Sequence, residues 1–495
     1  MYKWKIKQGT FRGLANYTRA MDNLVYVIAF TLAVAAAWGV VSLLIKAWRA
    51  AQERDETPWL LALPGAALAL ALFQFIKYMV LILPGILDIG EKVQRVERSR
   101  ELYLQLFGEV FKAEAVVRAG QQFVGLILAG VVLWALLNRF VNTKRNAQYV
   151  TWFFLVGFLG LVGYAIADFT LASIQAEYAN ALESGEEIAI WTQIVSILGG
   201  TALLYVSWRL WQSAPRRDSS LKVVFNLLAA IALLGGAWIL IGVLPPILEA
   251  GDKALWSGLA VTAWYSFITV PVQLALGLAI AYVLYQNIKG KSFFRMVYFL
   301  PYITPAVASA AVFRIMFSNR PTGMMNNLWA LFGADPLKWL LEPESVFTIF
   351  GISGPSLALV VIIIFNVWTY SGYNAVIFLA GLGGIPVSLY EAAEIDGGNR
   401  WQLFRFITLP LLSPVTYFLS LLGVIGTFKA FNHVFVLRNA AALRTVDTMS
   451  MVIWDLLKVD NRYGYSAAMA FVLFGVVLVL TIINNAIQGR RVFYG

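Results

Sequence analysis

The chain has 495 residues, of which 60% are hydrophobic and only 13% are charged. Because soluble domains carry roughly 25% charged residues, this composition excludes a soluble enzyme, a disordered protein and a fibrous protein. The net charge is +11. In so apolar a chain, this charge predicts basic cytoplasmic loops that contact anionic membrane lipid, and it does not indicate nucleic-acid binding. Without cysteine, and with His433 as the single histidine, the sequence predicts no metal site.

Apolar runs of about 20 residues, the length of a helix that crosses a bilayer, recur along the whole chain. They predict an all-α, polytopic membrane helix bundle of about eleven transmembrane helices. A segment rich in Pro, Arg and Ser between Trp211 and Lys222 divides the chain into residues 1–215, with about five of these helices, and residues 216–495. The predicted spans lie near residues 23–46, 59–88, 121–139, 149–171, 188–211, 221–248, 259–286, 293–318, 354–383, 411–434 and 466–489.

Short basic loops orient the second part. Three basic clusters fall on one side of the membrane if its helices alternate, and the positive-inside rule makes that side the cytoplasm. Residues 384–410 then lie in the cytoplasm as well, and two longer loops, near 319–353 and 435–465, lie outside. The prediction is a multi-pass protein of the plasma membrane, which is the inner membrane in a Gram-negative cell. The clusters are Lys289 with Lys291 and Arg295, Arg216 with Arg217 and Lys222, and Arg490 with Arg491.

The first part does not follow the same rule. If its helices simply alternate, the basic stretch 91–118 lies outside, against the positive-inside rule. A re-entrant piece within 59–88, which contains Lys77 and two prolines, would change the parity. The side on which the N-terminus lies therefore stays open.

The predicted cytoplasmic stretch 385–414 is patterned like folded structure. Ser388, followed three residues later by Glu391, matches a capping box and predicts the start of a short helix. Gly397 can take the left-handed conformation that ends a helix. Asn399 is the predicted cap of a second short helix, which Pro410 and Pro414 stop where the next span begins. This helix–turn–helix is either an interfacial loop or a docking element for a cytoplasmic partner.

The same stretch resembles the EAA signature of permease subunits of binding-protein-dependent ABC importers. The match is long, correctly spaced and correctly placed, which makes it far more specific than a lone glycine motif. Over residues 221–495 the chain is similar to the carbohydrate branch of these permeases, and in particular to the larger permease subunit of maltose-type transporters. The residues that carry the signature are Glu391, Ala392, Ala393, Gly397, Ile407, Leu409 and Pro410, and those typical of the branch include Asp396, Trp401 and Phe404.

The resemblance implies a type I ABC-importer permease core of six helices, preceded by a helical N-terminal extension of unknown role. It also implies that a helix at 388–397 sits in a groove of a separate ATPase subunit and transmits its movement. Glu391 would tie this helix to its surroundings, Ala392 and Ala393 would allow a close fit, and Gly397 would permit the turn. The implied coupling set is Ser388, Glu391, Ala392, Ala393, Asp396, Gly397, Ile407, Leu409 and Pro410.

The partners implied are two ATPase subunits, a second related permease subunit, an extracellular solute-binding protein and a sugar substrate. ATP–Mg would be bound by the ATPases, and no cofactor by this chain. A Walker A loop needs a glycine five residues before its Gly-Lys-Ser. Tyr285 occupies that position before Gly290, so the chain is expected to be a transport subunit and not an enzyme.

Two departures from the family pattern leave the exact sugar and the docking of the binding protein open. Arg438-Asn439-Ala440-Ala441 stands where many sugar permeases carry a Thr-Gly-Gly-Pro-like turn. The maltose-type subunit also carries a large extracellular insert, whereas here a short link joins 221–248 to 259–286.

A sugar site inside a membrane needs aromatic faces for the rings, and amides or hydroxyls for their OH groups. Two predicted spans, 354–383 and 411–434, offer both kinds of side chain. Polar groups at that depth usually face a cavity, although Trp and Tyr also mark interfaces and Asn can join helices. The predicted substrate path comprises Trp368, Tyr370, Tyr373, Asn374, Asn432 and His433.

The function that follows is an ATP-driven importer subunit for a carbohydrate, of the maltose or maltodextrin type. One alternative is an ion-coupled secondary transporter, which would need an internal repeat and coupling charges at the midplane. A membrane-integral enzyme is a further alternative, which would need a cluster of acids, bases or ligands at one depth.

Overall fold

The computed structural model describes residues 14–92, 100–141, 145–185, 189–213, 219–286, 288–349 and 352–488. The basic residues Arg216, Arg217, Arg490 and Arg491 lie outside this described part. The chain forms two compact units, Met1–Leu248 (unit 1) and Glu249–Gly495 (unit 2). The boundary between them falls at the end of α8 (Ser219–Ala250), later than the chain division at 215/216.

Unit 1 is built from long apolar helices. α2 and α6 pack side by side, and α3 packs between α5 and α6. Ser207 on α7 donates a 2.7 Å hydrogen bond to the carbonyl oxygen of Ala229 on α8. The elements are α1 (Ala15–Met21), α2 (Leu24–Arg54), η1 (Trp59–Leu61), α3 (Ala62–Lys92), α4 (Arg100–Lys112), α5 (Glu114–Leu137), α6 (Asn146–Ser184), α7 (Ile190–Ser213) and α8.

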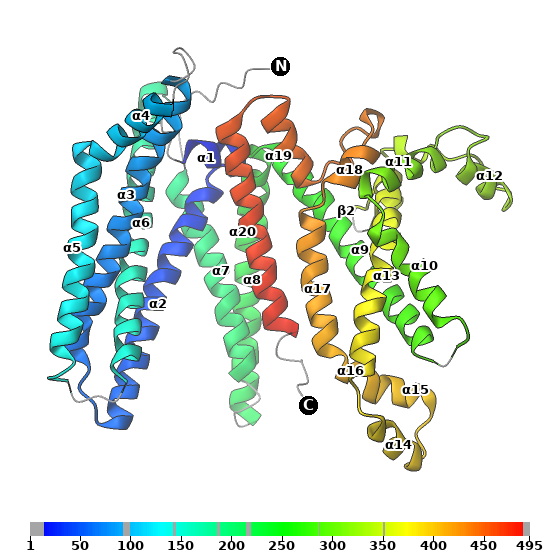
Figure 1. The fold of residues 1–495 in the computed structure, drawn as a ribbon, viewed down its shortest axis with the longest axis horizontal. Coiled ribbons are helices and arrows are strands. Elements are labelled where there is room, and N and C mark those ends of the chain that lie inside the picture. The colour runs from blue at the N-terminus through cyan, green and yellow to red at the C-terminus, as the bar shows by residue number, and fades with distance from the viewer. Residues whose placement is uncertain are drawn as a thin grey trace. The chain divides into compact units, whose positions relative to one another are not determined.

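Unit 2 is helical apart from one two-residue hairpin, in which Thr348 pairs with Ser353 and Ile349 with Ile352. Its first half runs through α9 (Lys253–Tyr285), α10 (Lys291–Ile303), α11 (Ala306–Met316), α12 (Met324–Ala330), η4 (Trp339–Leu341), β1 (Thr348–Ile349), β2 (Ile352–Ser353) and α13 (Leu357–Gly383). Its second half runs through α14 (Val387–Ile395), α15 (Arg400–Leu403), the π-helical turn η5 (Phe404–Thr408), α16 (Leu409–Leu411), α17 (Ser413–Phe428), α18 (Asn432–Leu437), η6 (Ala440–Ala442), α19 (Met449–Lys458) and α20 (Tyr463–Gln488) (Figure 1).

The centre of unit 2 is the pair of helices α9 and α13, which pack along their length. Of the spans in the described residues, α13 is the most enclosed, with 56% of its most apolar window buried. Ser356 caps it by accepting the backbone N–H of Leu359, which satisfies one of the unpaired amides at a helix start. The cavities described below lie along this pair of helices.

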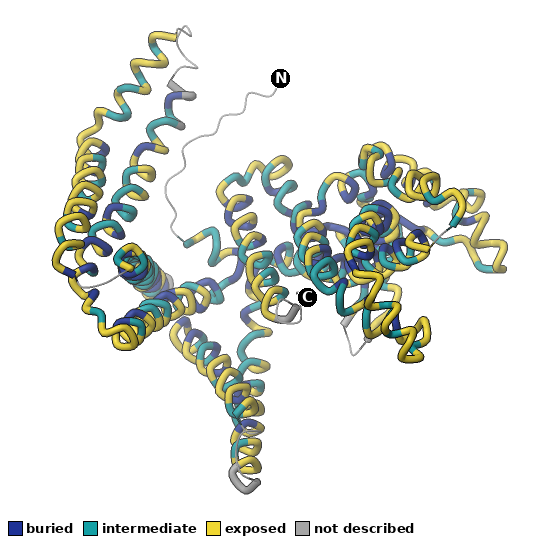
Figure 2. The backbone as a smooth tube through the Cα atoms, turned by 60° about the horizontal axis from the view of Figure 1, so that its bottom comes forward, coloured by how far each residue is buried: buried dark blue, intermediate teal, exposed yellow. Residues whose placement is uncertain are grey.

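The long helices are apolar on their outer sides as well as inside. Exposed residues alternate with buried ones along the helices (Figure 2), and large apolar side chains such as Trp38, Trp238 and Ile315 are 71%, 81% and 75% exposed. Surfaces of this kind suit contact with lipid. In the part of the chain that the structure describes, nine helices are long and apolar enough to cross a membrane, or up to eleven if each of two bent pairs is one span. The predicted all-α membrane bundle is confirmed.

Three predicted spans differ in detail. The predicted span 293–318 is broken into α10 and α11 by a 94° bend, because Pro305 cannot donate a backbone hydrogen bond and disfavours the helical conformation of Thr304. The predicted span 411–434 ends at Phe428, and its last residues open α18. A re-entrant piece within 59–88 is wrong, since α3 continues through Pro84 without a break.

Candidate functional site

A cavity of about 310 Å³ lies within unit 2 and is called here the inner cavity. Its wall comes from α9, α10, α11, α13, α17 and α18, and from the turn that joins the last two. The polar and aromatic lining residues are Gln273, Tyr302, Asn366, Tyr370, Tyr373, Asn374, Thr427, Lys429, Phe431, Asn432 and His433.

One wall of the inner cavity is aromatic. The ring of Tyr302 stacks on that of Tyr373 with centroids 4.5 Å apart and meets the ring of Tyr370 at 5.7 Å. Tyr302 lies just before the bend between α10 and α11, so the broken span brings this ring to α13. Aromatic faces of this kind favour stacking with a flat apolar ligand face.

The inner cavity also has amides in its lining. Asn374 donates a 3.4 Å hydrogen bond to the backbone oxygen of Gln273. The Gln273 side chain is only 4% exposed, and its Oε1 has no hydrogen-bond partner among the described residues. A buried acceptor without a partner is costly, so Gln273 carries an unsatisfied polar group next to the inner cavity that its side chain lines.

A buried polar cluster closes one end of the inner cavity and is called here the barrier cluster. The Tyr265 hydroxyl lies 2.8 Å from Nε2 of His433 and accepts a hydrogen bond from Nδ2 of Asn366. The His433 ring also stacks on Phe365 with centroids 5.2 Å apart. Tyr265 is fully buried, so these bonds fix α9, α13 and α18 against one another without water.

A second cavity, of about 550 Å³, lies beyond the barrier cluster and is called here the outer cavity. It is formed by the first turns of α9 and α13, the loops on either side of the β-hairpin, and residues 443–445. Trp264 on α9 and Leu359 on α13 line it, whereas Gln273 and Asn366 on the same two helices line the inner cavity. Tyr265 therefore lies on α9 between the residues that line the two cavities. The polar lining residues are Lys253, Ser257, Ser345, Ser353, Ser356, Arg444 and Thr445.

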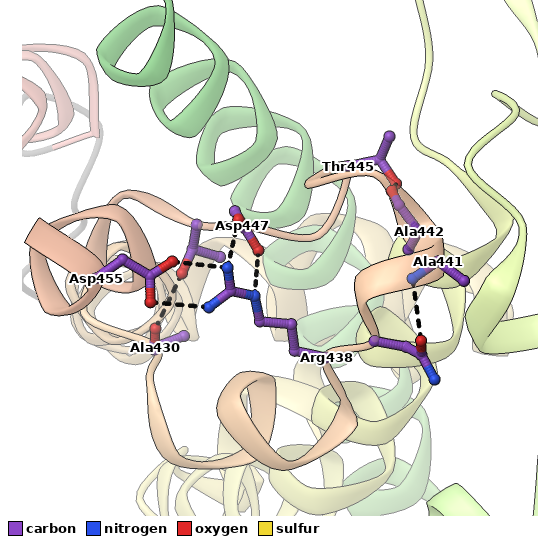
Figure 3. A network of polar contacts seen from close by, with 9 residues as sticks. Ala430, Arg438, Ala441, Ala442, Thr445, Asp447 and Asp455 are labelled. Carbon is purple, nitrogen blue, oxygen red and sulfur yellow. Dashed lines mark hydrogen bonds and ion pairs between the residues drawn. The ribbon is translucent and has the colours of Figure 1, made fainter. Parts of the chain in front are cut away.

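An arginine holds the loops beside the outer cavity (Figure 3). Nε of Arg438 lies 2.8 Å from Oδ1 of Asp447, and its Nη2 lies 2.6 Å from Oδ2 of Asp455. Burial raises the pKa of the Asp447 carboxyl, whereas the hydrogen bond to Asp455 raises the pKa of the Arg438 guanidinium. Arg438 and the two carboxylates are therefore partly desolvated, and each charge is stabilised by its partner. This arginine clamp joins the end of α18 to α19.

The stretch 385–414 forms a helix–turn–helix, with two differences from its prediction. α14 begins at Val387 after Pro386, with no side-chain cap, so the predicted capping box of Ser388 and Glu391 is wrong. Ser388 instead lies in the first turn of α14. The fixed φ of Pro386 already starts the helix one residue before Ser388.

The second short helix starts as predicted. Asn399 accepts the backbone N–H of Gln402 at 2.9 Å, and the Gln402 side chain accepts that of Asn399 at 2.8 Å. The helix does stop where Pro410 and Pro414 predict, since its path ends at Leu411 and a 62° bend precedes α17. The second difference is that the π-helical turn η5 lies within it. Pro410 lacks the N–H that a regular α-helix needs at this position. The π-helical turn before it accommodates the missing hydrogen bond.

α14 has no fully buried residue, and only Tyr390 and Ala393 are half-buried. The apolar side chains of Val387, Leu389 and Ile395 are 61%, 43% and 86% exposed. Its link to the body is Tyr390, whose hydroxyl lies 3.0 Å from Oγ1 of Thr408. This bond joins the two halves of the EAA signature, since Thr408 lies between Ile407 and Leu409.

The predicted coupling residues thus gather at one end of unit 2. Ser388, Glu391, Ala392 and Ala393 lie on α14, with Asp396 at its C-cap. Ile407 lies in η5, and Leu409 and Pro410 lie in α16. Gly397 has the predicted left-handed backbone, with φ of +81°.

Five predicted path residues line the inner cavity and one does not. Tyr370, Tyr373, Asn374, Asn432 and His433 are in its lining. Trp368 packs on Phe313 with centroids 5.2 Å apart and is outside that lining.

Sequence reasoning missed three residues of this region, Tyr265, Gln273 and Tyr302. Gln273 interrupts an apolar run two residues after Pro271, and a buried amide in such a run could have indicated it. Tyr302 lies between Pro301 and Pro305. These prolines could have indicated a break in the predicted span 293–318, but not the direction of the ring.

Residues 273–492 match the family model described as the binding-protein-dependent transport system inner membrane component. A trehalose/maltose transport system permease protein of Thermococcus litoralis is 30% identical over 47% of this chain and 74% of its own length. An arabinooligosaccharides transport system permease protein of Bacillus subtilis is 30% identical over 48% and 71%. A lactose transport system permease protein of Rhizobium radiobacter is 31% identical over 47% and 76%.

A solved structure is also similar. It is described as a bacterial alginate ABC transporter in complex with an alginate pentasaccharide-bound periplasmic protein. The match covers 58% of this chain and 99% of that chain, with 23% identity and a TM-score of 0.42, a value too low to support any conclusion about this chain.

Proposed function

Because the chain belongs to the family of inner membrane components of binding-protein-dependent transport systems, we propose that it is the permease subunit of an ATP-driven importer of an oligosaccharide. It is a multi-pass protein of the plasma membrane. Its relatives are named for trehalose/maltose, arabinooligosaccharides and lactose. Their common class is a short saccharide, and within that class a maltose-like sugar stays one candidate.

The observation that carries this proposal is α14. A nine-residue helix with no buried residue gains little from its own packing, yet it is fixed to the body by the bond between Tyr390 and Thr408. A short rigid helix with exposed apolar side chains suits insertion into a groove of another protein. That protein is proposed to be one of two ATPase subunits, and a second permease and an extracellular binding protein complete the complex.

The mechanism proposed for these parts follows from their positions in unit 2. α14 follows directly on α13, so a displacement of α14 by closure of the ATPases around ATP–Mg is transmitted along α13 to the inner cavity. The barrier cluster then opens or closes, because its three side chains come from three helices that can move relative to one another. In the inner cavity the tyrosine rings stack on the sugar and the amides bond its hydroxyl groups. ATP hydrolysis takes place on the partner chains.

Membership of this family favours the importer over the ion-coupled secondary transporter. Binding-protein-dependent transport differs from ion-coupled secondary transport, so the latter is not proposed for this chain. Among the described residues no group of three or more His, Cys, Asp or Glu could hold a metal ion, and no set of catalytic groups is proposed.

The test is co-purification of the tagged full-length chain from its native membrane, compared between the unmodified chain and Glu391→Lys. We expect nucleotide-binding subunits to accompany the unmodified chain and to be lost from the variant, because charge reversal on exposed α14 opposes docking. Glu344→Lys is the matched control, since the same charge reversal lies on an exposed loop next to Ser345, outside α14. Equal recovery of ATPase subunits with all three chains would contradict the coupling role, and their absence from the unmodified chain would contradict the importer.

A further inference from the structure

We propose that the transported saccharide carries a negative charge, and that this chain selects it with the lysines and the arginine that line the two cavities. The inference rests on the proposed function, since it names the substrate class of the same path. The charged residues that line the two cavities are Lys429 in the inner one and Lys253 and Arg444 in the outer one. No described lining residue of either cavity is Asp or Glu.

Lys429 is the charged residue of the inner cavity. It lies at the C-cap of α17, where the negative end of the helix dipole favours a cation. No ion pair within the described residues involves it. An ammonium group on a cavity wall can therefore pair with an anionic group of a ligand.

Gln273 brings a side-chain amide to the wall of the inner cavity. Its buried Oε1 lacks a partner among the described residues, and a turn of the amide toward the cavity would let a hydroxyl of a saccharide supply one. Gly423 keeps room for this amide, because a Cβ at Gly423 would lie 3.0 Å from Gln273 Nε2. The inner cavity thus offers an acceptor for a hydroxyl and a cation for an acidic group.

The outer cavity has the same sign of charge. Lys253 and Ser356 lie at the starts of α9 and α13, and the N-terminal dipole of α13, which the neutral Ser356 caps, adds positive potential to that of Lys253 and Arg444. The nearby carboxylates lie outside the lining. Asp252 caps α9 by accepting the backbone N–H of Ala254 at 2.8 Å, which offsets the dipole of that helix, and Asp447 is held in the arginine clamp and also attracted by Arg444.

The loop that carries Arg444 has an unusual backbone. Leu443 and Arg444 have φ of +47° and +65°, the left-handed region that residues other than glycine rarely adopt. Thr445 anchors the next position through a 2.9 Å hydrogen bond that its Oγ1 donates to Oγ of Ser356, and Asp447 is fixed by Arg438. The fold therefore holds Arg444 at the outer cavity despite local strain.

The two cavities follow each other along the same helices. Leu359 lines the outer cavity and Asn366 the inner one, a separation of about 10 Å at the rise of an α-helix. Both sides of the barrier cluster therefore present cations, which repel a cationic solute, give no advantage to a neutral one and attract an anionic one.

The experiment uses the complex purified through the tagged full-length chain, without its binding protein, so that only the membrane complex selects the ligand. Equilibrium dialysis compares a radiolabelled α-1,4-linked trigalacturonate with the neutral trisaccharide of the same linkage, in which hydroxymethyl groups replace the carboxylates. A hydrogen bond to a charged group contributes about 1.5–3 kcal/mol. We therefore expect the acidic probe to bind at least about tenfold more tightly, with the ratio falling as NaCl is raised.

Variants assign the preference to named residues. Lys429→Gln and the double variant Lys253→Gln with Arg444→Gln should each reduce the ratio of the two affinities. Lys338→Gln should leave it unchanged, because this exposed lysine lines neither cavity. Equal affinity for the two probes, tighter binding of the neutral one, a ratio indifferent to Lys429, or binding of neither probe overturns the inference. If ATPase subunits still co-purify in those cases, the proposed function stands, and their absence is the result that removes it.

Discussion

The two units differ most in where they keep polar groups. Of the buried polar side chains among the described residues, Thr170 and Ser207 are in unit 1, and each donates to a backbone carbonyl. In unit 2 buried polar groups bond to one another across helices, as Thr427 does to Ser266 at 2.7 Å. Among the described residues, unit 2 therefore buries many more polar side chains than unit 1. Polar groups at membrane depth usually face a cavity, and the inner cavity lies in unit 2.

Ion pairs show the same contrast. In unit 1, Arg118 and Glu114 form an i, i+4 pair with side chains 68% and 86% exposed. In unit 2, the side chains of Arg438 and Asp447 in the arginine clamp are 25% and 5% exposed. An exposed pair adds little stability, but removing one partner of a buried pair leaves an uncompensated charge.

The largest expected effect follows from that difference. Arg438→Ala should lower the free energy of unfolding of unit 2 by about 3–5 kcal/mol, because Asp447 and Asp455 stay partly buried and repel each other. Arg118→Ala, the matched change in unit 1, should cost about 0.5 kcal/mol or less. Thermal unfolding of the two variants in the same detergent, followed by circular dichroism, measures both.

A second variant separates charge from packing. Arg438→Met with Asp447→Asn and Asp455→Asn should recover part of the loss, because it removes the unpaired charges. Equal shifts in Tm for Arg438→Ala and Arg118→Ala would show that the clamp is no more important than a surface pair.

The sequence predicted the helical class and the signature of the coupling stretch because both depend on local pattern. The runs that became α2, α9 and α13 are apolar over more than a bilayer's width, and Asn399 and Gly397 cap and end short helices through their own chemistry. The barrier cluster could not be predicted, since Tyr265 and His433 are 168 residues apart in the chain. Tertiary packing alone brings them together.

Failures in local detail had local causes. Ser388 and Glu391 fit the pattern of a capping box, but Pro386 started α14 first. Trp368 shares α13 with Tyr370 and Tyr373, yet a step of two residues turns a side chain by about 200° around a helix. The residue types on α13 therefore predicted the right helix for the substrate path. Only the structure shows which of its side chains face the inner cavity.

Loss of the Tyr265 hydroxyl should have a smaller effect on stability, confined to the barrier cluster. Tyr265→Phe leaves buried groups of His433 and Asn366 without their partner, at a cost of about 1–3 kcal/mol. We expect the barrier cluster to loosen and the inner cavity to become reachable from the outer side. The chain has no cysteine, so Ala430→Cys, at a lining position of the inner cavity, reports this access by its rate of labelling with a membrane-impermeant thiol reagent.

Ser207→Ala is the control in unit 1, since it also removes a buried hydroxyl between two helices. It should cost about 1 kcal/mol and leave the labelling of Ala430→Cys unchanged. If both variants raise the labelling rate equally, the effect is general loosening and Tyr265 is not part of a barrier.

Replacing a glycine at the end of a helix in each unit should have the smallest effect on stability, but a different effect on function in the two units. Gly397 and Gly185 both have left-handed backbones, with φ of +81° and +70°, and neither has an atom within 4 Å of an added Cβ. Alanine at either position should therefore cost about 1 kcal/mol through backbone strain alone. Because Gly397 ends α14, Gly397→Ala should also displace the proposed coupling helix and lower saccharide-stimulated ATP hydrolysis by the purified complex, whereas Gly185→Ala at the end of α6 should leave it unchanged. Loss of stimulation in both variants would mean that unit 1 takes part in coupling, and loss in neither would mean that the turn after α14 tolerates the strain.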